Sequence, residues 1–301
     1  MDTIPNREPF IQPLNADWYR PYVASLDMLR LDVVHPVVSG NKWYKLKHNL
    51  QHAIDEEYKA ILTFGGAYSN HLVAAAAAAK QYGFKSIGIV RGIYAQDSMT
   101  STLQECAGYG MELQFVSREE YAMKEEGNYL LQLSRRFDTP YIIPEGGANE
   151  YGRIGCEEIA SFIDDKYTHI CLSVGTGTSF CGVANALPGE VEVYGYAPMK
   201  GGDYLNEIID VYIESDRRAN KHIYSDWHFG GFGKYTDELI GLMNEFYRTN
   251  AIPLDMVYTS KMMAGIQQQL QQQVFPTDAR ILCIHTGGLQ GNASIQQSLI
   301  Y

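Results

Sequence analysis

Three lysines stand close together in the segment SGNKWYKLKHNL, which spans residues 39–50. Lys42 and Lys45 are three residues apart, and Lys47 follows them. The segment comes after the apolar, β-branched run Leu31–Val38 and opens an expected helix. A lysine amine becomes a reagent when burial or neighbouring cations lower its pKa, whereas a lysine in water stays a solvated cation. The segment alone does not decide between a reagent and a solvated basic helix face.

Four expected strands end in glycine-containing turns that lead into helices. In open α/β sheets, ligands bind beyond the carboxyl ends of the strands. A helix that begins there offers unpaired N–H groups and a partial positive charge, so these turns are where an anionic ligand is expected. The turns are FGGAYSNH (64–71), PEGGANEYG (144–152), SVGTGTSFCG (173–182) and IHTGGLQG (284–291).

The richest of these turns contains GTGTS, formed by Gly175, Thr176, Gly177, Thr178 and Ser179. Its glycines let the backbone approach an anion closely and its hydroxyls add donors, which suits a phosphate group. The loop is not a Walker A motif, since no Gly-Lys-Ser/Thr follows, and its glycines lack the GxGxxG spacing of dinucleotide-binding loops. A phosphate site and a tight turn without a ligand both remain open.

Ser69 and Asn70 stand at the start of another expected helix. Either residue is a good N-cap. The same helix N-terminus could also hold a carboxylate, because internal partners satisfy only some of its exposed N–H groups. The two roles are therefore compatible.

Short β-rich runs alternate with helical stretches, which predicts α/β units around mainly parallel sheets. A run of six alanines at 74–79 predicts a thin helix face that can lie close to a sheet. The expected strands are 60–64, 86–90, 112–116, 141–143, 169–174, 191–196 and 281–285. The expected helices are 41–54, 70–82, 98–108, 118–137, 151–164, 236–250, 260–273 and 293–299.

Composition narrows the class of partner. The 301 residues suffice for two domains, and the net charge of −11 argues against nucleic acid or an anionic membrane surface as a partner. No apolar run reaches the length of a membrane span, and the N-terminus lacks a signal-peptide pattern. The five cysteines are scattered without metal-ligand spacing. We therefore expect a cytoplasmic protein with reduced thiols, a small-molecule substrate and no metal.

The order of six short motifs resembles the pyridoxal 5'-phosphate (PLP) enzymes of the tryptophan synthase β type, known as fold type II. The motifs are GNKxxKL, GGxxSNH, PxGG, the GTGTS-type loop, VYT and HTGG, and they extend from about Leu31 to the C-terminus. Within these enzymes the chain is most similar to the D-cysteine desulfhydrase and 1-aminocyclopropane-1-carboxylate (ACC) deaminase family. The resemblance implies two three-layer α/β/α domains with mainly parallel sheets and PLP between them. A small domain at 45–152 is inserted into a large domain formed by 1–44 and 153–301, and homologues are usually homodimers.

The resemblance also assigns roles to single residues. Lys42, directly after Gly-Asn, matches the lysine that forms the Schiff base with PLP, whereas Lys45 and Lys47 keep a structural or solvated role. Asn70 matches the residue beside the phenolic oxygen of the cofactor, and Ser69 the residue near the substrate carboxylate. The loop Gly175–Ser179 matches the phosphate cradle.

Three further hydroxyl residues match the family pattern. Tyr258 corresponds to an active-site tyrosine that faces the substrate, and Thr286 to the residue near the pyridine nitrogen, with Thr259 close by. A hydroxyl partner leaves that nitrogen unprotonated, which weakens the pull on the Cα carbanion and favours elimination over transamination. ACC deaminases usually carry Glu and Leu at these two threonine positions. Thr259 and Thr286 therefore favour the desulfhydrase branch.

Four residues depart from the family pattern. Trp43, Tyr44 and Lys47 replace Thr, Arg and Glu after the lysine, and Phe232 replaces a second active-site tyrosine. The resemblance still predicts a PLP-dependent lyase or deaminase that converts a small amino acid, such as D-cysteine or ACC, into ammonia and a 2-oxo acid. A PLP-binding homologue without turnover and a nucleotide-binding α/β enzyme remain as alternatives.

Overall fold

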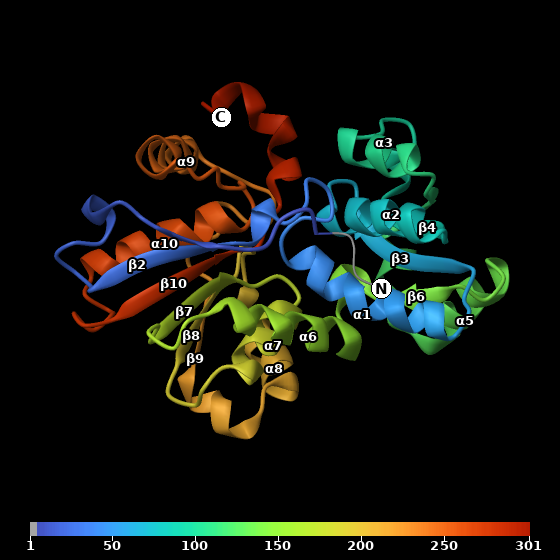
Figure 1. Ribbon diagram of the computed structural model, residues 1–301. Helices are drawn as coiled ribbons and strands as arrows, with labels where there is room; N and C mark the ends of the chain where they lie inside the picture. The colour runs from blue at the N-terminus through green and yellow to red at the C-terminus, as the bar shows by residue number, and fades with distance from the viewer. Residues whose placement is uncertain (1–4) are drawn as a thin grey trace. The chain divides into compact units, whose positions relative to one another are not determined.

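The strands form two separate sheets, one in each of two units of the computed structural model (Figure 1). The structure describes residues 5–301, apart from the side chains of residues 217–219. The small unit consists mainly of His35–Val38 and Lys42–Gly155, and the large unit of Arg7–Val34, Ser39–Asn41 and Cys156–Tyr301. The main segment of the small unit is thus three residues longer at each end than the expected domain 45–152. The predicted α/β fold class with two mainly parallel sheets is confirmed.

A four-stranded parallel sheet forms the centre of the small unit, in the order β5-β4-β3-β6. Its two central strands are buried almost throughout, which explains their apolar sequences. The strands are β3 (Ala60–Gly66), β4 (Lys85–Arg91), β5 (Glu112–Val116) and β6 (Tyr141–Ile143). The helices are α1 (Asn41–Asp55), α2 (Asn70–Tyr82), α3 (Ser101–Gly108), α4 (Arg118–Ala122) and α5 (Gly127–Arg136).

Helix α2 lies close to this sheet, as its alanine run predicts. Five of the six alanines are buried. On the sheet, a Cβ atom at Gly65 of β3 would lie 2.6 Å from Leu72 Cγ, and one at Gly88 of β4 would lie 3.4 Å from Leu72 Cδ2. Small residues on both elements therefore allow the close approach.

A six-stranded sheet forms the centre of the large unit, in the order β1-β2-β10-β7-β8-β9. Strand β1 pairs antiparallel with β2, and the other pairs are parallel. The strands are β1 (Ile11–Pro13), β2 (Ser25–Arg30), β7 (His169–Ser173), β8 (Glu192–Tyr196), β9 (Lys221–Tyr224) and β10 (Arg280–His285). The helices are α6 (Glu150–Glu157), which begins in the small unit, α7 (Thr178–Ala186), α8 (Leu205–Tyr212), α9 (Asp237–Asn250) and α10 (Thr259–Gln271).

The core of the large unit lies where helices α9 and α10 pack with the sheet. Phe246 of α9 and Met263 of α10 are fully buried with Met28 of β2 and Cys283 of β10. Short 3-10 segments connect the elements of both units: η1 (Ala16–Trp18), η2 (Leu31–Val33), η3 (Ile93–Ala95), η4 (Glu145–Gly147), η5 (Glu158–Phe162), η6 (Gly202–Tyr204), η7 (Ser215–Asn220) and η8 (Leu289–Ser298).

Several elements differ from the sequence-based expectation. Strand β2, which was not among the expected strands, ends at Arg30, and the apolar run Leu31–Val38 that follows it begins with the 3-10 turn η2. The expected helix 118–137 is two helices, α4 and α5. Strand β2 was missed because Asp27 and Arg30 interrupt its apolar pattern.

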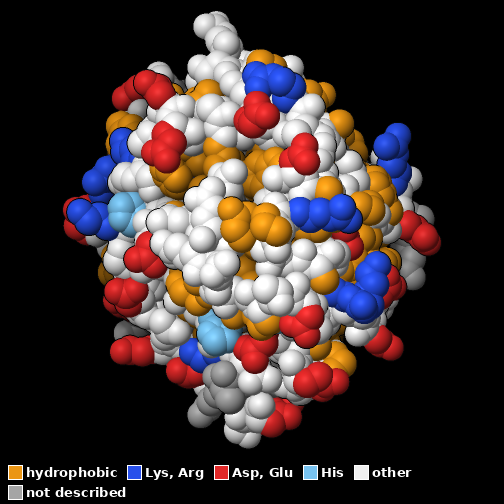
Figure 2. All heavy atoms as spheres, turned by 90° about the vertical axis from the view of Figure 1, so that its left-hand side faces the viewer, with side chains coloured by type: hydrophobic (Ala, Val, Ile, Leu, Met, Phe, Trp, Pro, Cys, Tyr) orange, Lys and Arg blue, Asp and Glu red, His pale blue; other side chains and the backbone are white. Residues whose placement is uncertain are grey.

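Charged side chains are scattered over the face shown in Figure 2, between uncharged and hydrophobic ones, and acidic groups are prominent among them. This distribution agrees with the net charge of −11. Within residues 5–301, no helix combines the length and the hydropathy that a membrane crossing requires.

Candidate active site

The segment that precedes Lys42 is held against the turn after β10. The Asn41 backbone N–H donates to the Thr286 carbonyl oxygen at 3.2 Å, and the Gly40 N–H donates to the Leu31 carbonyl at 3.0 Å. Gly40 has a φ of 60°, and a Cβ atom there would lie 2.0 Å from the Thr286 carbonyl oxygen. Only glycine fits this contact, because any side chain would collide with backbone. The backbone of Gly40 and Asn41, directly before Lys42, is therefore fixed by contacts within the large unit.

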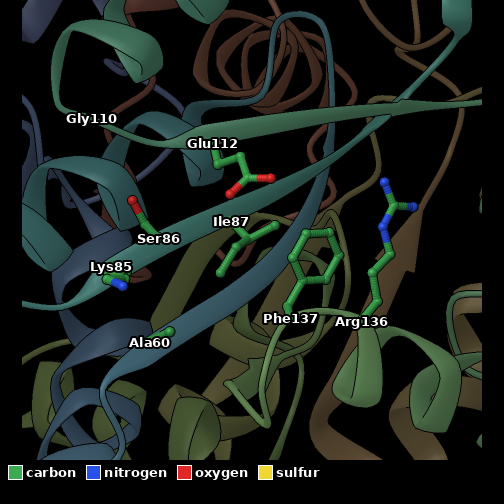
Figure 3. Close-up of a pocket in the computed structure, with 8 residues that line it drawn as sticks. All are labelled: Ala60, Lys85, Ser86, Ile87, Gly110, Glu112, Arg136 and Phe137. Atoms are coloured by element: carbon green, nitrogen blue, oxygen red, sulfur yellow. The ribbon is translucent and has the colours of Figure 1, made fainter.

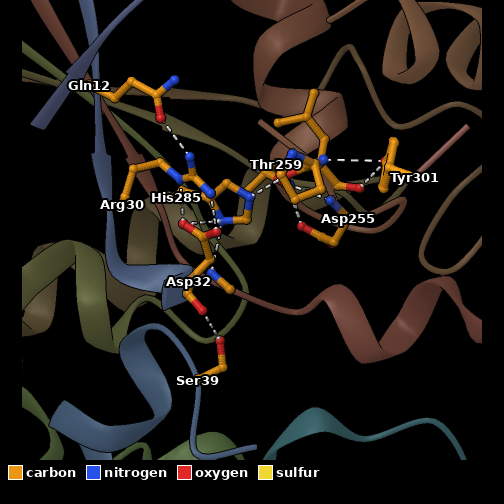
Figure 4. Close-up of polar contacts among 11 residues, drawn as sticks. Gln12, Arg30, Asp32, Ser39, Asp255, Thr259, His285 and Tyr301 are labelled. Atoms are coloured by element: carbon orange, nitrogen blue, oxygen red, sulfur yellow. Dashed lines mark hydrogen bonds and ion pairs between the residues drawn. The ribbon is translucent and has the colours of Figure 1, made fainter. Parts of the chain in front are cut away.

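A buried ion pair lies next to this segment (Figure 4). The Arg30 guanidinium donates to both oxygens of Asp32, with Nε–Oδ1 at 2.8 Å and Nη2–Oδ2 at 2.7 Å. Burial alone would raise the pKa of the Asp32 carboxyl, but the nearby His285 and the paired Arg30 outweigh it, so this pKa lies below its usual range. The Asp32 carbonyl oxygen accepts from the Ser39 hydroxyl at 3.0 Å. The ion pair is thereby connected to the start of the GNK motif.

The GTGTS loop forms the uncapped start of helix α7. Gly177 is the N-cap residue with a φ of 81°, and no side chain caps the first turn. The hydroxyls of Thr176 and Thr178 lie 2.8 Å apart, and the Ser179 hydroxyl accepts from Asn41 Nδ2 at 2.8 Å. An uncapped helix N-terminus surrounded by hydroxyls fits the phosphate group that PLP would bring. Asn41 was not expected at this loop, although its place beside Lys42 is a signal that could have found it.

Tyr258 lies beside this loop. A Cβ atom at Gly175 would be 3.4 Å from Tyr258 Cε1, which is ordinary van der Waals contact, so the ring packs directly against the loop. The ring of Phe232 meets the Tyr258 ring edge to face, with centroids 5.9 Å apart and an interplanar angle of 75°. Phe232 is 53% exposed. The large unit therefore brings the predicted residues Gly175 and Tyr258 together with Phe232.

Asp255 caps the start of helix α10 and fixes Tyr258. Its Oδ1 accepts from the backbone N–H groups of Val257 at 3.0 Å and Tyr258 at 2.7 Å. Its Oδ2 accepts from the Thr259 N–H at 2.8 Å and the Thr259 hydroxyl at 2.6 Å. The Thr259 hydroxyl thus donates to the Asp255 carboxylate and accepts from the Asp255 N–H at 2.9 Å, so both of these bonds serve the start of the helix. Sequence analysis missed Asp255, although an acidic residue just before a helix is a capping signal.

In the small unit, Ser69 and Asn70 stand at the start of helix α2. The Ser69 hydroxyl accepts from the Leu72 N–H at 3.3 Å, so Ser69 is the N-cap. Both residues are half-buried. The capping role expected for Ser69 is therefore present, and its second predicted role, contact with a substrate carboxylate, stays a prediction.

His71, the next residue of α2, is a buried polar group that the sequence did not single out. The Thr63 hydroxyl donates to the Ile143 carbonyl at 2.8 Å, so at 2.9 Å it must accept from His71 Nε2–H. The other ring nitrogen, Nδ1, has no hydrogen-bond partner among the described residues. Burial, with the charges of Lys42 and Lys45, lowers the pKa of His71 to about 3. His71 is therefore a neutral imidazole that carries an unused lone pair.

The residues around Lys42 on helix α1 are mostly buried. Trp43, Tyr44 and Lys45 are 4%, 5% and 6% exposed, whereas Lys42 and Lys47 are half-buried. The solvated role considered for Lys45 is thus wrong, and the structural one stands. Trp43 and Tyr44 belong to the hydrophobic interior, so their departure from the family pattern is a packing difference.

A hollow of about 650 Å³ in the small unit lies away from these residues (Figure 3). Ala60, Lys85 and Glu112 on its wall are the first residues of β3, β4 and β5. It therefore opens at the amino ends of parallel strands, whereas Ser69 and Asn70 follow the carboxyl end of β3. The hollow is not part of the candidate site.

Comparisons with known proteins identify the family of the chain. A family model described as "Pyridoxal-phosphate dependent enzyme" matches residues 28–287. Relatives from Pyrococcus horikoshii and Thermotoga maritima are both named "Putative 1-aminocyclopropane-1-carboxylate deaminase". The first is 26% identical over 89% of this chain and 86% of its own length, and the second is 27% identical over 90% of each.

Solved structures give the same result. An ACC deaminase homologue matches with a TM-score of 0.85 and 26% identity, over 100% of this chain and 95% of its own. An O-ureido-L-serine synthase shares the fold, with a TM-score of 0.69 and 13% identity over 97% and 92% of the two chains. Because the family model spans most of the chain, the chain belongs to the family of pyridoxal-phosphate dependent enzymes.

Proposed function

We propose that the chain is a PLP-dependent lyase or deaminase for a small amino acid and that Lys42 binds the cofactor covalently. The observation that carries this proposal is the fixed backbone of Ser39–Asn41 against the turn after β10, which ends directly before Lys42. A lysine that carries a cofactor must be attached at a well-defined point, because small displacements of a reacting group reduce rate strongly. Lys42 meets this requirement.

The residues of the chain divide the remaining tasks. PLP, when bound, withdraws electrons from the substrate Cα. The start of α7, Gly175–Ser179, would hold its phosphate with backbone N–H groups and hydroxyls. Asn70 would donate to its phenolic oxygen. Thr286 would donate its hydroxyl to the ring nitrogen, and Thr259, whose own hydroxyl proton goes to Asp255, would lie close by.

Tyr258 and the Lys42 amine are the candidates for proton transfer at Cα. The Tyr258 backbone is fixed by Asp255, and its ring is positioned between Gly175 and Phe232. Ser69, at the start of α2, would orient the substrate carboxylate beside the N–H groups of a helix N-terminus. A fixed ring and an oriented carboxylate meet the geometric need of general acid–base catalysis.

For the substrate, we propose D-cysteine first and ACC second. D-cysteine with water would give sulfide, pyruvate and ammonia, and hydroxyl residues at positions 259 and 286 support this elimination. ACC with water would give 2-oxobutyrate and ammonia, and the names of the two relatives support it. We also propose a cytoplasmic homodimer. The five free, buried cysteines support a reducing compartment, and light scattering would test the dimer.

A substrate panel on PLP-loaded protein tests the function. D- and L-cysteine, D- and L-serine and ACC are each scored for sulfide, 2-oxo acid and ammonia. We expect product from D-cysteine or ACC. Bound PLP without product from any member would instead indicate a homologue without turnover, and tight NAD or ATP binding without PLP would indicate a nucleotide-binding enzyme.

Borohydride reduction followed by peptide mapping tests the lysine. We expect the pyridoxyl label on Lys42 in the wild type and no stable label in Lys42→Ala. Lys47→Ala, a half-buried lysine of the same helix, is the matched control and should keep the label. A label on another lysine in the Lys42→Ala protein would refute the assignment.

A further inference from the structure

Lys261, the third residue of helix α10, is a buried lysine that none of the proposed steps uses. It is only 1% exposed. Its Nζ donates to the carbonyl oxygens of His228 and Gly231, each at 2.8 Å, and of Pro198 at 3.3 Å. An ammonium group has three donors, so three acceptors satisfy it completely. Burial lowers the pKa of Lys261 to about 8, and the charge of Asp255 opposes this shift.

The three carbonyl groups belong to segments that follow the carboxyl ends of strands. Pro198 comes shortly after β8, and His228 and Gly231 belong to the turn after β9. The turn has little regular structure, since Phe229, Gly230, Gly231 and Gly233 have φ values of 48°, 91°, 117° and 68°. Backbone bonds from Gly231 N–H to His228 O and from Lys234 N–H to Gly231 O close it. The Lys261 side chain adds the bonds that join this turn to helix α10.

The turn 228–234 carries Phe232, the residue that meets the Tyr258 ring. Tyr258 itself stands three residues before Lys261, and its backbone carbonyl oxygen accepts from the Met262 N–H at the start of the same helix. The start of helix α10 therefore holds both rings of the aromatic contact. Tyr258 is held through the backbone, and the turn that carries Phe232 is held through the Lys261 side chain. A loss of the Lys261 bonds would free Phe232 to move relative to Tyr258.

We infer that Lys261 is a positioning residue that ties the turn 228–234 to helix α10, so that Phe232 covers Tyr258 and limits the size of the substrate side chain. The inference rests on the proposed function insofar as Tyr258 faces the substrate. The tether itself does not depend on turnover. Two separate readouts can therefore test the two parts.

Hydrogen exchange of the turn tests the tether without any substrate. Lys261→Met keeps the length of the side chain and removes all three donors. We expect the amides of residues 229–233 to exchange about tenfold faster in PLP-loaded Lys261→Met, and Lys261→Arg to restore most of the protection. Lys234→Met, an exposed lysine of the same turn, is the matched control and should leave exchange unchanged. Wild-type exchange in folded Lys261→Met would overturn the tether.

Specificity tests the role of the covered tyrosine. The ratio of kcat/KM for D-cysteine to that for the longer S-methyl-D-cysteine should fall about fivefold in Lys261→Met. Phe232→Ala should lower the ratio equally while leaving the exchange of the remaining turn amides unchanged. An unchanged ratio in both variants would overturn the specificity role. If Lys261→Met does not fold, the kcat/KM ratio of Phe232→Ala alone decides the specificity role. Lys261→Arg, which keeps hydrogen-bond donors, must then show the wild-type kcat/KM ratio. A wild type that turns over no panel member refutes the proposed function and leaves the exchange result standing.

Discussion

The backbone N–H of Asn41 donates a hydrogen bond to the carbonyl oxygen of Thr286, and the neighbouring Gly40 lies against the same oxygen. This contact joins the GNK motif near the beginning of the chain to the HTGG motif near its end. Gly40, Asn41 and Thr286 all belong to the large unit. The backbone directly before Lys42 is therefore held by two sequence motifs that are distant along the chain.

Gly40→Ala should be strongly destabilising. Its φ of 60° is unfavourable for alanine, and the new Cβ would lie 2.0 Å from the Thr286 carbonyl oxygen. We expect a loss of about 2–4 kcal/mol in the free energy of unfolding, measured by urea denaturation. Gly241→Ala in helix α9, where nothing lies within 4 Å, is the control and should gain about 0.5–1 kcal/mol. If Gly40→Ala and Gly241→Ala changed the free energy of unfolding equally, the close contact of Gly40 with the Thr286 carbonyl would be contradicted.

Arg30→Met should leave the Asp32 carboxylate buried without its guanidinium. The two side chains are only 8% and 2% exposed, so we expect a loss of about 3–5 kcal/mol at neutral pH. The folded-state pKa of Asp32 is lowered, so its contribution is fully present above the ordinary value of 3.8 and is lost as the pH falls below it. The difference between wild type and variant should therefore shrink below that pH.

The control for this ion pair is an exposed one. Arg248→Met removes a pair with Glu245 on the surface of helix α9, where both side chains are more than half exposed. We expect a change of less than about 1 kcal/mol from this substitution. If Arg30→Met lowered the free energy of unfolding no more than Arg248→Met does, the buried pair would not support the fold.

His71 should make the protein sensitive to mild acid. Its pKa of about 3 in the folded state lies below the ordinary value of 6.5, so the unfolded chain binds its proton first. The stabilisation is fully present above pH 6.5 and is lost as the pH falls toward 3, with a total on the order of 3–5 kcal/mol. His71→Gln keeps a donor for Thr63 and does not titrate. Its unfolding free energy should depend less on pH between 6.5 and 4, and an unchanged slope would be incompatible with a buried neutral His71.

Phe232→Tyr should add a hydroxyl beside Tyr258 with little effect on stability, because the ring is 53% exposed. A donor at this position could hold the carboxylate of an amino acid. We expect KM for the preferred substrate to fall about three- to tenfold. Tyr235→Phe, an exposed tyrosine close in sequence, is the control and should leave KM unchanged. An unaltered KM in Phe232→Tyr would place the ring outside the substrate's reach.

Much of the fold could be predicted from local patterns. The strands of the small unit are short apolar runs, and their bounds differ from the expected ones by two residues or fewer. Strand β2 could not be found in this way. Asp27 is tolerated inside the strand because the Tyr167 hydroxyl, from a distant part of the chain, donates to its carboxylate at 2.6 Å. Arg30 is tolerated because it pairs with Asp32, which lies beyond the end of the strand.

The candidate site could be predicted only where a motif names its residues. The GTGTS loop and Tyr258 were proposed this way. Asn41 and Lys261 were not, because their roles depend on distant partners: Asn41 donates to Ser179, and Lys261 donates to carbonyl groups in three other places. Asp255 was missed although its partners are local, since it accepts from Val257, Tyr258 and Thr259. A backbone carbonyl leaves no trace in the sequence, so a lysine that binds several of them resembles any other lysine.

The alanine face of helix α2 has a consequence for how this sequence can change over evolution. Leu72 contacts the sheet where Gly65 and Gly88 leave room for it, and the buried alanines continue that surface toward the end of the helix. A larger residue on either surface would push the helix outward and carry Ser69 and Asn70 with it. We therefore expect substitutions at these positions to covary among relatives, with each gain in volume on the helix matched by a loss on the strands.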